Sequence, residues 1–177
     1  MDVFSREPGI SGDTGRILKV GKVAQTVRFR SLLLWVGVHW CEGPGLCGGT
    51  GCAMCDAGIP RRRKAWVACD RPNGTLAALE ITESDVRTLA KAADAEGAQI
   101  RPGMSFLIRR TADRQPLTVD SYRFFANVGE ISQDVLQNDV LRFHGVMATM
   151  ADIRTGSYRS LVLARAAELS RKTRAYA

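Results

Sequence analysis

The sequence predicts a mainly β, α+β protein in which five strands form a small barrel. A cysteine-rich loop at residues 39–59 separates the first two strands, and a helical extension closes the chain. Three observations lead to this prediction: strand-like runs come in two pairs with short turns, one helical pattern lies between the pairs, and two more follow them. The 177 residues are enough for one ordinary hydrophobic core.

The composition favours a protein that binds a polyanion. Apolar residues make up 45% of the chain and charged residues 24%, which is typical of a globular protein rather than a disordered one. The net charge is +7, and cations gain affinity for phosphates by releasing counterions. No run of about 18 apolar residues occurs and the N-terminal residues lack a signal-peptide layout, so we expect a cytoplasmic protein without a membrane partner.

The first half of the chain predicts an arm and three strands. Residues 1–16 lack periodicity and are expected to form a flexible N-terminal arm before a domain at 17–128. Residues 27–38 begin with alternating polarity and end as a continuous apolar run, which is typical of a long, curved strand. Strand-like residues 63–70 and 75–81 flank a Pro-Asn-Gly turn and predict a β-hairpin.

The next elements complete a known order of strands. Thr82 is a suitable N-cap for an amphipathic helix that ends near Gly97. Residues 104–110 and 116–124 then predict a second hairpin. Five strands with a helix between the third and fourth is the element order of the OB-fold, a small Greek-key barrel that often binds single-stranded nucleic acid.

The last part of the chain predicts a helical extension at residues 129–177. Helical periodicity covers residues 132–150 and 157–174, with Ser132 and Ser157 as candidate caps. We expect this extension to follow the barrel rather than to belong to it, and to offer a surface for self-association.

Clustered cysteines in the loop at 39–59 predict a zinc site. Cys52 and Cys55 form a C-x2-C pair, and Cys47 lies five residues before Cys52. Short cysteine spacings in a reducing compartment favour a metal over disulfides. The spacing leaves the fourth ligand open between His39 and Cys41, and four ligands would make a closed, structural site.

Cations and aromatic residues beside this loop predict a nucleic-acid surface. The run from Arg61 to Lys64 leads into Trp66, which shares a strand face with Lys64, while Ala65 and Val67 form an apolar opposite face. Single strands are bound by cations along the phosphates and by rings on which bases stack. The predicted phosphate contacts are Arg28, Arg30, Arg61, Arg62, Arg63, Lys64, Arg109, Arg110 and Arg123, and the predicted stacking residues are Trp40, Trp66 and Tyr122.

With these residues the chain resembles the zinc-bearing OB-fold single-stranded DNA-binding proteins of tailed phages and mobile elements. The resemblance covers residues 28–123. It rests on the strand order and on His39, Cys47, Cys52 and Cys55, which match that family's ligand types and their order. It implies His39 as the fourth ligand, a structural zinc, and sequence-tolerant coating of single strands during replication or recombination.

The sequence contains no convincing catalytic triad, phosphate-binding Walker loop or carboxylate pair, so we expect a binding protein rather than an enzyme. The leading hypothesis is a single-stranded DNA-binding protein that acts in replication, recombination or repair. Two alternatives stay open: a zinc-stabilised module that docks a replication or transcription protein, and an RNA-binding protein.

Overall fold

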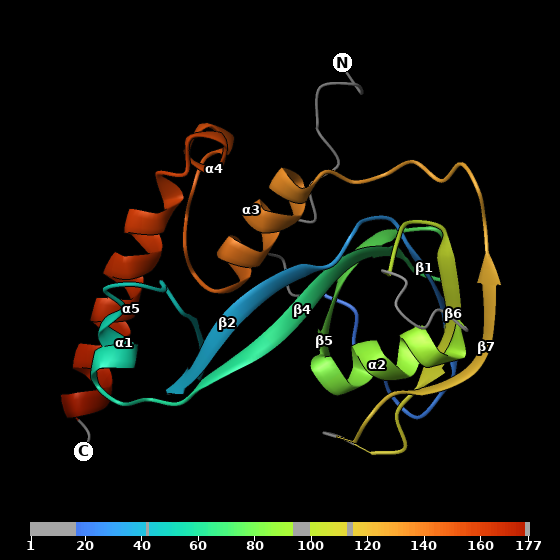
Figure 1. The fold of residues 1–177 in the computed structure, drawn as a ribbon, viewed down its shortest axis with the longest axis horizontal. Helices are drawn as coiled ribbons and strands as arrows, with labels where there is room; N and C mark the ends of the chain where they lie inside the picture. The colour runs from blue at the N-terminus through green and yellow to red at the C-terminus, as the bar shows by residue number, and fades with distance from the viewer. Residues whose placement is uncertain (1–16, 42, 94–99, 113–114, 176–177) are drawn as a thin grey trace.

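The chain forms an α+β structure of seven strands and five helices over the described residues, which are 17–41, 43–93, 100–112 and 115–175 of a computed structural model (Figure 1). The strands are β1 (Gln25–Phe29), β2 (Leu34–Cys41), β3 (Gly43–Leu46), β4 (Arg61–Asp70), β5 (Leu76–Thr82), β6 (Met104–Arg109) and β7 (Thr118–Phe124). The helices are α1 (Ala53–Asp56), α2 (Glu83–Ala92), α3 (Gln133–Phe143), α4 (Met150–Thr155) and α5 (Tyr158–Ala175).

All seven strands belong to one mostly antiparallel sheet. Their order is β3-β2-β4-β1-β6-β7, and β5 pairs with β4. The long strand β4 is the centre of this sheet, because it pairs with β5 and, at different positions, with both β2 and β1. Both predicted hairpins are confirmed, as β4–β5 and β6–β7.

The predicted first strand is two strands, with a break at residues 30–33. At the break, the Ser31 hydroxyl accepts a hydrogen bond from the Ala68 N–H at 2.9 Å and donates one to the Leu32 carbonyl. A side chain therefore replaces one backbone bond between this segment and β4. The break lets β1 pair with β6 while β2 runs on to the cysteine loop.

The sheet is open rather than closed into the predicted five-stranded barrel. In the part of the chain that the structure describes, no ladder joins β5 to β7, and the sheet has seven strands. Helix α2 instead packs against β4, β5 and β7. Its predicted N-cap is confirmed, because Thr82 and Asp85 form a reciprocal capping box.

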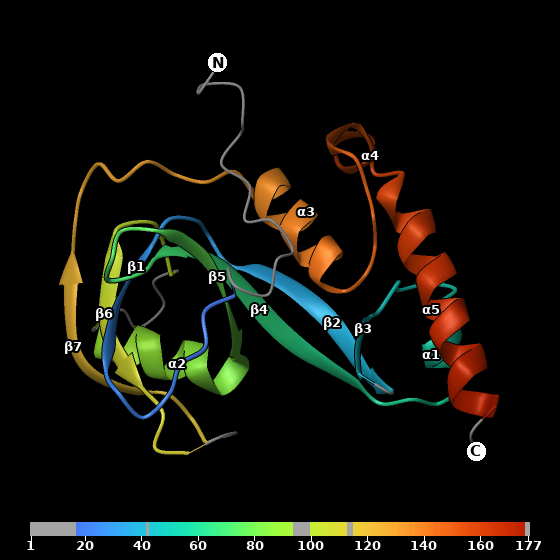
Figure 2. The same ribbon diagram turned by 180° about the vertical axis from the view of Figure 1, so that it is seen from behind.

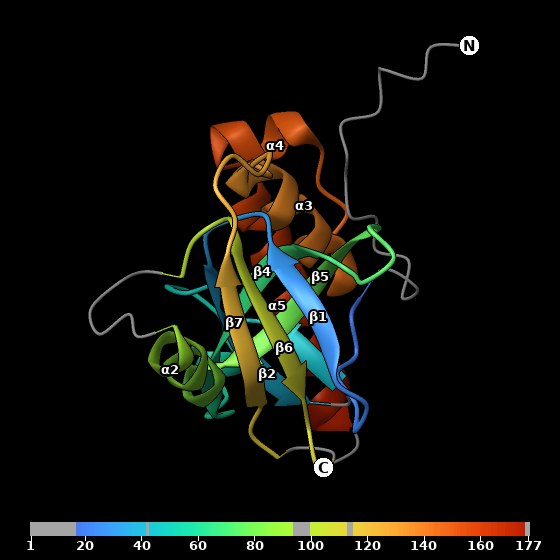
Figure 3. The same cartoon turned by 90° about the vertical axis from the view of Figure 1, so that its right-hand side faces the viewer.

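Two hydrophobic cores lie on the two faces of β4. Ala65 and Val67 belong to the core beneath α2, whereas Trp66 and Ala68 belong to a core shared with α3, α4 and α5. Figure 2 and Figure 3 show α2 and these C-terminal helices on different sides of the sheet. The prediction that the Trp66 face points to solvent is therefore wrong: the side chain is 0% exposed and its ring lies 5.2 Å from that of Phe143.

The C-terminal extension contains three helices instead of two. The Ser132 cap is confirmed, since its hydroxyl accepts a hydrogen bond from the Val135 N–H. The first helix ends at Phe143, before Gly145 with a φ of 75°, and Thr149 then caps α4. None of the helices in the described ranges is long and apolar enough to cross a bilayer.

Candidate metal centre

Four side chains from three consecutive elements converge at one end of the molecule. His39 lies on β2, Cys47 follows β3, Cys52 precedes α1, and Cys55 lies within α1. Their ligand atoms all lie within 4.8 Å of one another. The side chain of Cys41, the alternative fourth ligand, lies outside the described residues. The predicted grouping of His39 with three cysteines could therefore hold a metal ion.

The separations within this cluster agree with tetrahedral coordination. The Cys47 and Cys55 sulfurs are 3.5 Å apart, and His39 Nε2 lies 3.4 Å from the Cys55 sulfur and 3.8 Å from the Cys52 sulfur. A tetrahedral zinc ion, with Zn–S bonds of about 2.3 Å and Zn–N bonds of about 2.0–2.1 Å, places its ligand atoms about 3.5–3.8 Å apart. The donor set and its spacing are therefore consistent with zinc.

The imidazole of His39 is oriented for coordination by the backbone. Its Nδ1 lies 2.9 Å from the Ile59 carbonyl and 3.2 Å from the Pro60 carbonyl. Because a carbonyl only accepts hydrogen bonds, Nδ1 carries the proton and Nε2 presents its lone pair to the sulfurs. His39 is fully buried, which holds the ring in this orientation.

Glycines bring the loop around the cluster. Gly49 and Gly51 have φ values of 75° and 82°, in the left-handed region that glycine tolerates best. This turn lets the Gly49 N–H lie 3.4 Å from the Cys47 sulfur and donate to it, while the Cys52 N–H donates to the Gly49 carbonyl. Backbone donors to sulfur stabilise a thiolate.

The thiols of the cluster have shifted pKa values. Burial acts to raise the pKa of Cys52, but hydrogen bonds from the backbone of Cys55, Gly48 and Met54 outweigh it, so the pKa lies below its ordinary value. The hydrogen bond to Cys47, then burial and the nearby thiolate charges, raise the pKa of Cys55 to about 11. A divalent cation would relieve this repulsion, because it stabilises every thiolate that coordinates it.

The cysteine loop is packed against helix α5, a contact that the sequence did not predict. Cys52 and Met54 are fully buried against Ala166 of that helix. A Cβ at Gly48 would collide with the Leu163 side chain, so a larger residue here would force Leu163 to move. The four candidate ligands thus lie beside the C-terminal helix, and a metal bound by them would fix the loop against which that helix packs.

Five of the predicted phosphate contacts are engaged in ion pairs. Arg110 bonds the fully buried Asp85 at 2.9 Å, and Arg30 bonds Asp70 at the same distance. Backbone donors and Arg110 outweigh the effect of burial and hold the pKa of Asp85 below its ordinary value. The three remaining pairs are more exposed, and they are Arg63–Glu83, Lys64–Glu80 and Arg109–Asp120.

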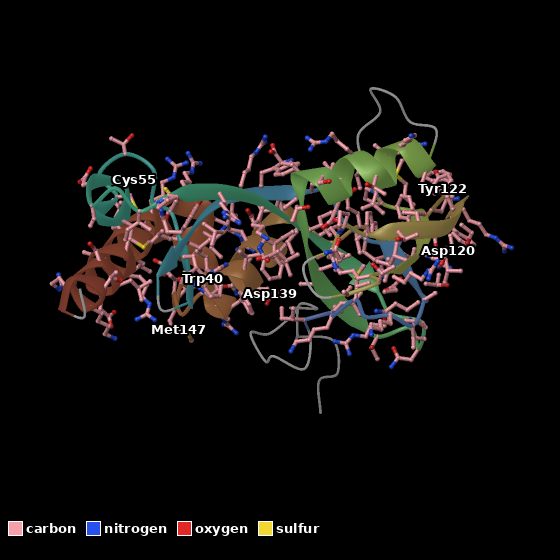
Figure 4. All side chains as sticks on the ribbon, turned by 90° about the horizontal axis from the view of Figure 1, so that it is seen from below. Trp40, Cys55, Asp120, Tyr122, Asp139 and Met147 are labelled. Atoms are coloured by element: carbon pink, nitrogen blue, oxygen red, sulfur yellow. The ribbon has the colours of Figure 1, made fainter. Side chains whose placement is uncertain are left out.

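The other predicted contacts are accessible to different degrees. Arg28, Arg61, Arg62 and Arg123 have no acidic partner among the described residues. Tyr122 is half-buried against Phe106, with ring centroids 5.2 Å apart. Trp40 is 73% exposed. Figure 4 shows Trp40 and Cys55 at one end of the molecule and Asp120 and Tyr122 at the other.

A second group of aromatic and cationic residues, which we call the β7 platform, includes the predicted Arg28, but its other three members, Arg101, Phe124 and Phe125, were missed by sequence reasoning. Phe124 and Phe125 are 44% and 36% exposed at the end of β7. The Arg101 guanidinium lies 4.4 Å from the centre of the Phe124 ring, and that of Arg28 lies 4.1 Å from the centre of the Phe125 ring. Two adjacent aromatic residues at a strand end were the available signal, because one of them would ordinarily face the core.

The fold and the cluster define an α+β protein with a loop that could bind a metal through one histidine and three cysteines. No protein-family model matches this chain, and no curated protein matches it.

Proposed function

We propose that this chain is a sequence-tolerant single-stranded DNA-binding protein that acts in replication, recombination or repair. Its zinc is structural and it is not an enzyme. Three cysteines and one histidine fill a tetrahedral shell, so no position is open for a reactive water. The zinc then supports a binding surface instead of carrying out a reaction.

The observation that carries this proposal is a set of exposed rings beside guanidinium groups without acidic partners among the described residues. Trp40 is at one end of the sheet, on the same face as the exposed Arg62, which pairs with Val38 two residues before Trp40. Phe124 and Phe125 are in the β7 platform at the other end. Bases that stack on such rings must be unpaired, because a duplex buries their faces, and cations hold the phosphates between them.

The order of the elements supports the same proposal. When β3 and α1 of the cysteine loop are set aside, the segment with β1 and β2 is followed by β4, β5, α2, β6 and β7. This is the strand and helix order of the OB-fold, a fold that is itself only partly closed. Together with His39 and its three cysteines, this order resembles the zinc-bearing single-stranded DNA-binding proteins of tailed phages and mobile elements.

The test is a fluorescence-anisotropy titration with labelled single-stranded and duplex DNA of equal length. The wild-type protein should prefer the single strand. Trp40→Ala and Phe124→Ala should each cost on the order of 1–3 kcal/mol of binding free energy, because each removes a stacking ring. Met147→Ala is the matched control, since Met147 is 74% exposed but has no ring.

Two outcomes would contradict the proposal. Equal or tighter binding of duplex DNA would argue against stacking on unpaired bases, and no binding at low salt would remove DNA as the partner. Elemental analysis of the purified protein should find about one zinc per chain. A different metal, or none, would contradict the zinc assignment.

A protein-docking function is the second candidate, because Trp40 and Met147 are both large, exposed and apolar. A hydrogen bond between His144 and the Pro44 carbonyl holds the segment after α3 against β3, next to the strand that carries Trp40. Binding of a protein partner would leave only weak, non-specific affinity for DNA. Competition with RNA in the same titration tests the RNA-binding alternative, because an RNA-binding protein would release the labelled DNA. Sedimentation tests self-association through the C-terminal helices.

A further inference from the structure

A groove of about 270 Å³ lies where the first half of β2, ahead of its pairing with β3, meets the cysteine loop and helices α3 and α5. Its floor includes Trp35 and Gly37 of β2. Its walls include Gln137 of α3 and the first residues of α5, Tyr158 and Arg159. The backbone of Gly48 and Gly49 closes the end nearest the metal cluster. None of the described residues that line this groove is acidic.

Arg61 reaches the groove by crossing the neighbouring strand. Gly37 and Arg63 are paired across β2 and β4, and Arg61 lies two residues earlier on the same face. A Cβ at Gly37 would collide with the Arg61 guanidinium, so the glycine leaves the path that this side chain follows. The guanidinium therefore lies over β2 and faces the groove instead of solvent beyond β4.

Arg61 and Arg159 are the two cations of the groove, and neither has an acidic partner within the described ranges. Nearby arginines do have one: Arg63 bonds Glu83, and Arg165 bonds Glu168. The Tyr158 hydroxyl and the Gln137 amide add hydrogen-bond donors. Two unpaired guanidinium groups without a carboxylate between them form a site that attracts a phosphate.

The metal cluster holds the two walls of this groove together. Cys47 lines the groove and is also one of the four candidate ligands. Leu163 of α5 packs against Gly48, one turn after the groove residue Arg159. Because the loop is tied to α5 beside the ligands, losing the metal would free the wall that carries Arg159 from the strand that carries Arg61.

We propose that this groove binds one phosphodiester of a single strand, that Arg61 over the floor and Arg159 in the wall hold it together, and that the metal is required because it sets their separation. This inference rests on the proposed function. It adds Arg159, Tyr158 and Gln137 to the binding surface, and it assigns the zinc loop a direct part in forming a site for the ligand.

The test measures affinity for a labelled oligothymidylate across a range of salt concentrations. Arg61→Ala and Arg159→Ala should each weaken binding about tenfold and lower the slope of log K against log salt by about 0.7, the value for one phosphate of a single strand. The controls are Arg87→Ala on α2 and Arg171→Ala on α5, which remove one exposed cation each away from the groove. Circular dichroism verifies that all four variants are folded.

The metal is tested on the same variants. Removing it with a chelator should weaken wild-type binding as far as the combined Arg61→Ala and Arg159→Ala substitutions do. It should weaken this double variant little further. Leu163→Ala gives a second measurement, because it loosens the wall without changing a ligand, and it should reduce affinity with the metal still bound. Independent, additive losses from chelation and from the double variant would overturn the coupling.

Failure of the groove and failure of the proposed function give different results. If the wild-type protein binds single strands and both arginine variants bind them as tightly as it does, the groove is not the phosphate site and the proposed function stands. If no single strand binds, the proposed function fails. In that case inorganic phosphate is titrated while the arginine Nε–H signals are followed by nitrogen-15 NMR, and the absence of shifts at Arg61 and Arg159 overturns the groove.

Discussion

Trp66 shows how one residue changes its role once the fold is known. On β4 it lies between the exposed cations of Arg61–Lys64 and the buried end of the strand, and alternation alone places it on the same face as Lys64. The helices after the sheet cover that face from Trp66 onward, so the polar face becomes a core face within a single strand. Trp40 has no such cover and is 73% exposed, so it is the tryptophan that we propose as a stacking residue.

We therefore expect Trp66→Ala to act on stability. Removing a fully buried tryptophan should lower the free energy of unfolding by about 3–5 kcal/mol, as measured by urea denaturation. Trp40→Ala is the matched control and should change stability little, because its side chain is exposed. Unchanged stability of the Trp66 variant, combined with lost DNA affinity, would return Trp66 to the binding surface.

The ion pair of Asp85 with Arg110 should make the stability of the protein depend on pH. The folded pKa of Asp85 lies below the ordinary value, so the ionised form stabilises the protein above the ordinary pKa of about 4, and this contribution is lost as pH falls through the lowered pKa. Asp85→Asn should cost about 3 kcal/mol at pH 7, since it leaves Arg110 without its buried partner.

Urea denaturation at several pH values checks this. The difference in stability between Asp85→Asn and the wild-type protein should shrink as the pH is lowered below about 4. Asp120→Asn is the control, because its pair with Arg109 is more exposed and exposed pairs contribute little. A constant difference at all pH values would contradict the ion pair as the cause.

The cysteine loop connects two elements, β2 and α5, through the candidate ligands and through packing. His39 comes from the strand, the cysteines come from the loop and α1, and the buried residues of that loop pack on Ala166 of the helix. A hydrogen bond with Cys47, burial and thiolate repulsion raise the pKa of Cys55. A metal bound here would contribute to tertiary structure by replacing this repulsion with attraction to a common cation.

Removing the metal should loosen the contacts between the cysteine loop and α5 and leave β6 and β7, at the far end of the sheet, intact. After chelation, or in His39→Ala, we expect hydrogen exchange to accelerate at least about tenfold in the cysteine loop and α5 but not in β6 and β7. Exchange followed by mass spectrometry checks this. Cys69→Ala is the control, because Cys69 is buried in the core beneath α2, outside the cluster.

Across the whole molecule, the C-terminal helices share one of the two cores of the sheet. Trp66 and Ala68 of β4 lie in the same cluster as Leu136 and Leu141 of α3 and Val162 of α5. The helices are therefore packed into the protein, although the sequence predicts an extension at 129–177. A domain boundary after residue 128 stays a prediction, and truncation tests it.

A chain that ends at residue 128 should lose cooperative unfolding. Exposing each large apolar side chain of this core costs about 1.5–3 kcal/mol, and several such losses exceed the usual net stability of a domain. Tryptophan emission and thermal denaturation measure the effect, and a chain lacking only residues 171–177 is the control. Cooperative unfolding of the truncated chain would establish 17–128 as an independent domain.

Local patterns were enough for much of this protein. The Pro-Asn-Gly turn, the Thr82 and Ser132 caps and the short cysteine spacings each depend on residues close in sequence, so the β4–β5 hairpin, two helix starts and three members of the metal cluster could be predicted from the sequence. Such signals act over a few residues, where backbone geometry and side-chain chemistry decide the outcome.

The tertiary structure decided everything that depends on contacts between distant segments. Ser31 breaks the first strand by bonding Ala68, Asp85 binds Arg110 instead of leaving it for phosphate, and the C-terminal helices bury Trp66. The open sheet and the groove beside α5 also arise from such packing. Burial and ion pairing depend on what covers a side chain, and the covering residue can lie a hundred positions away in the chain.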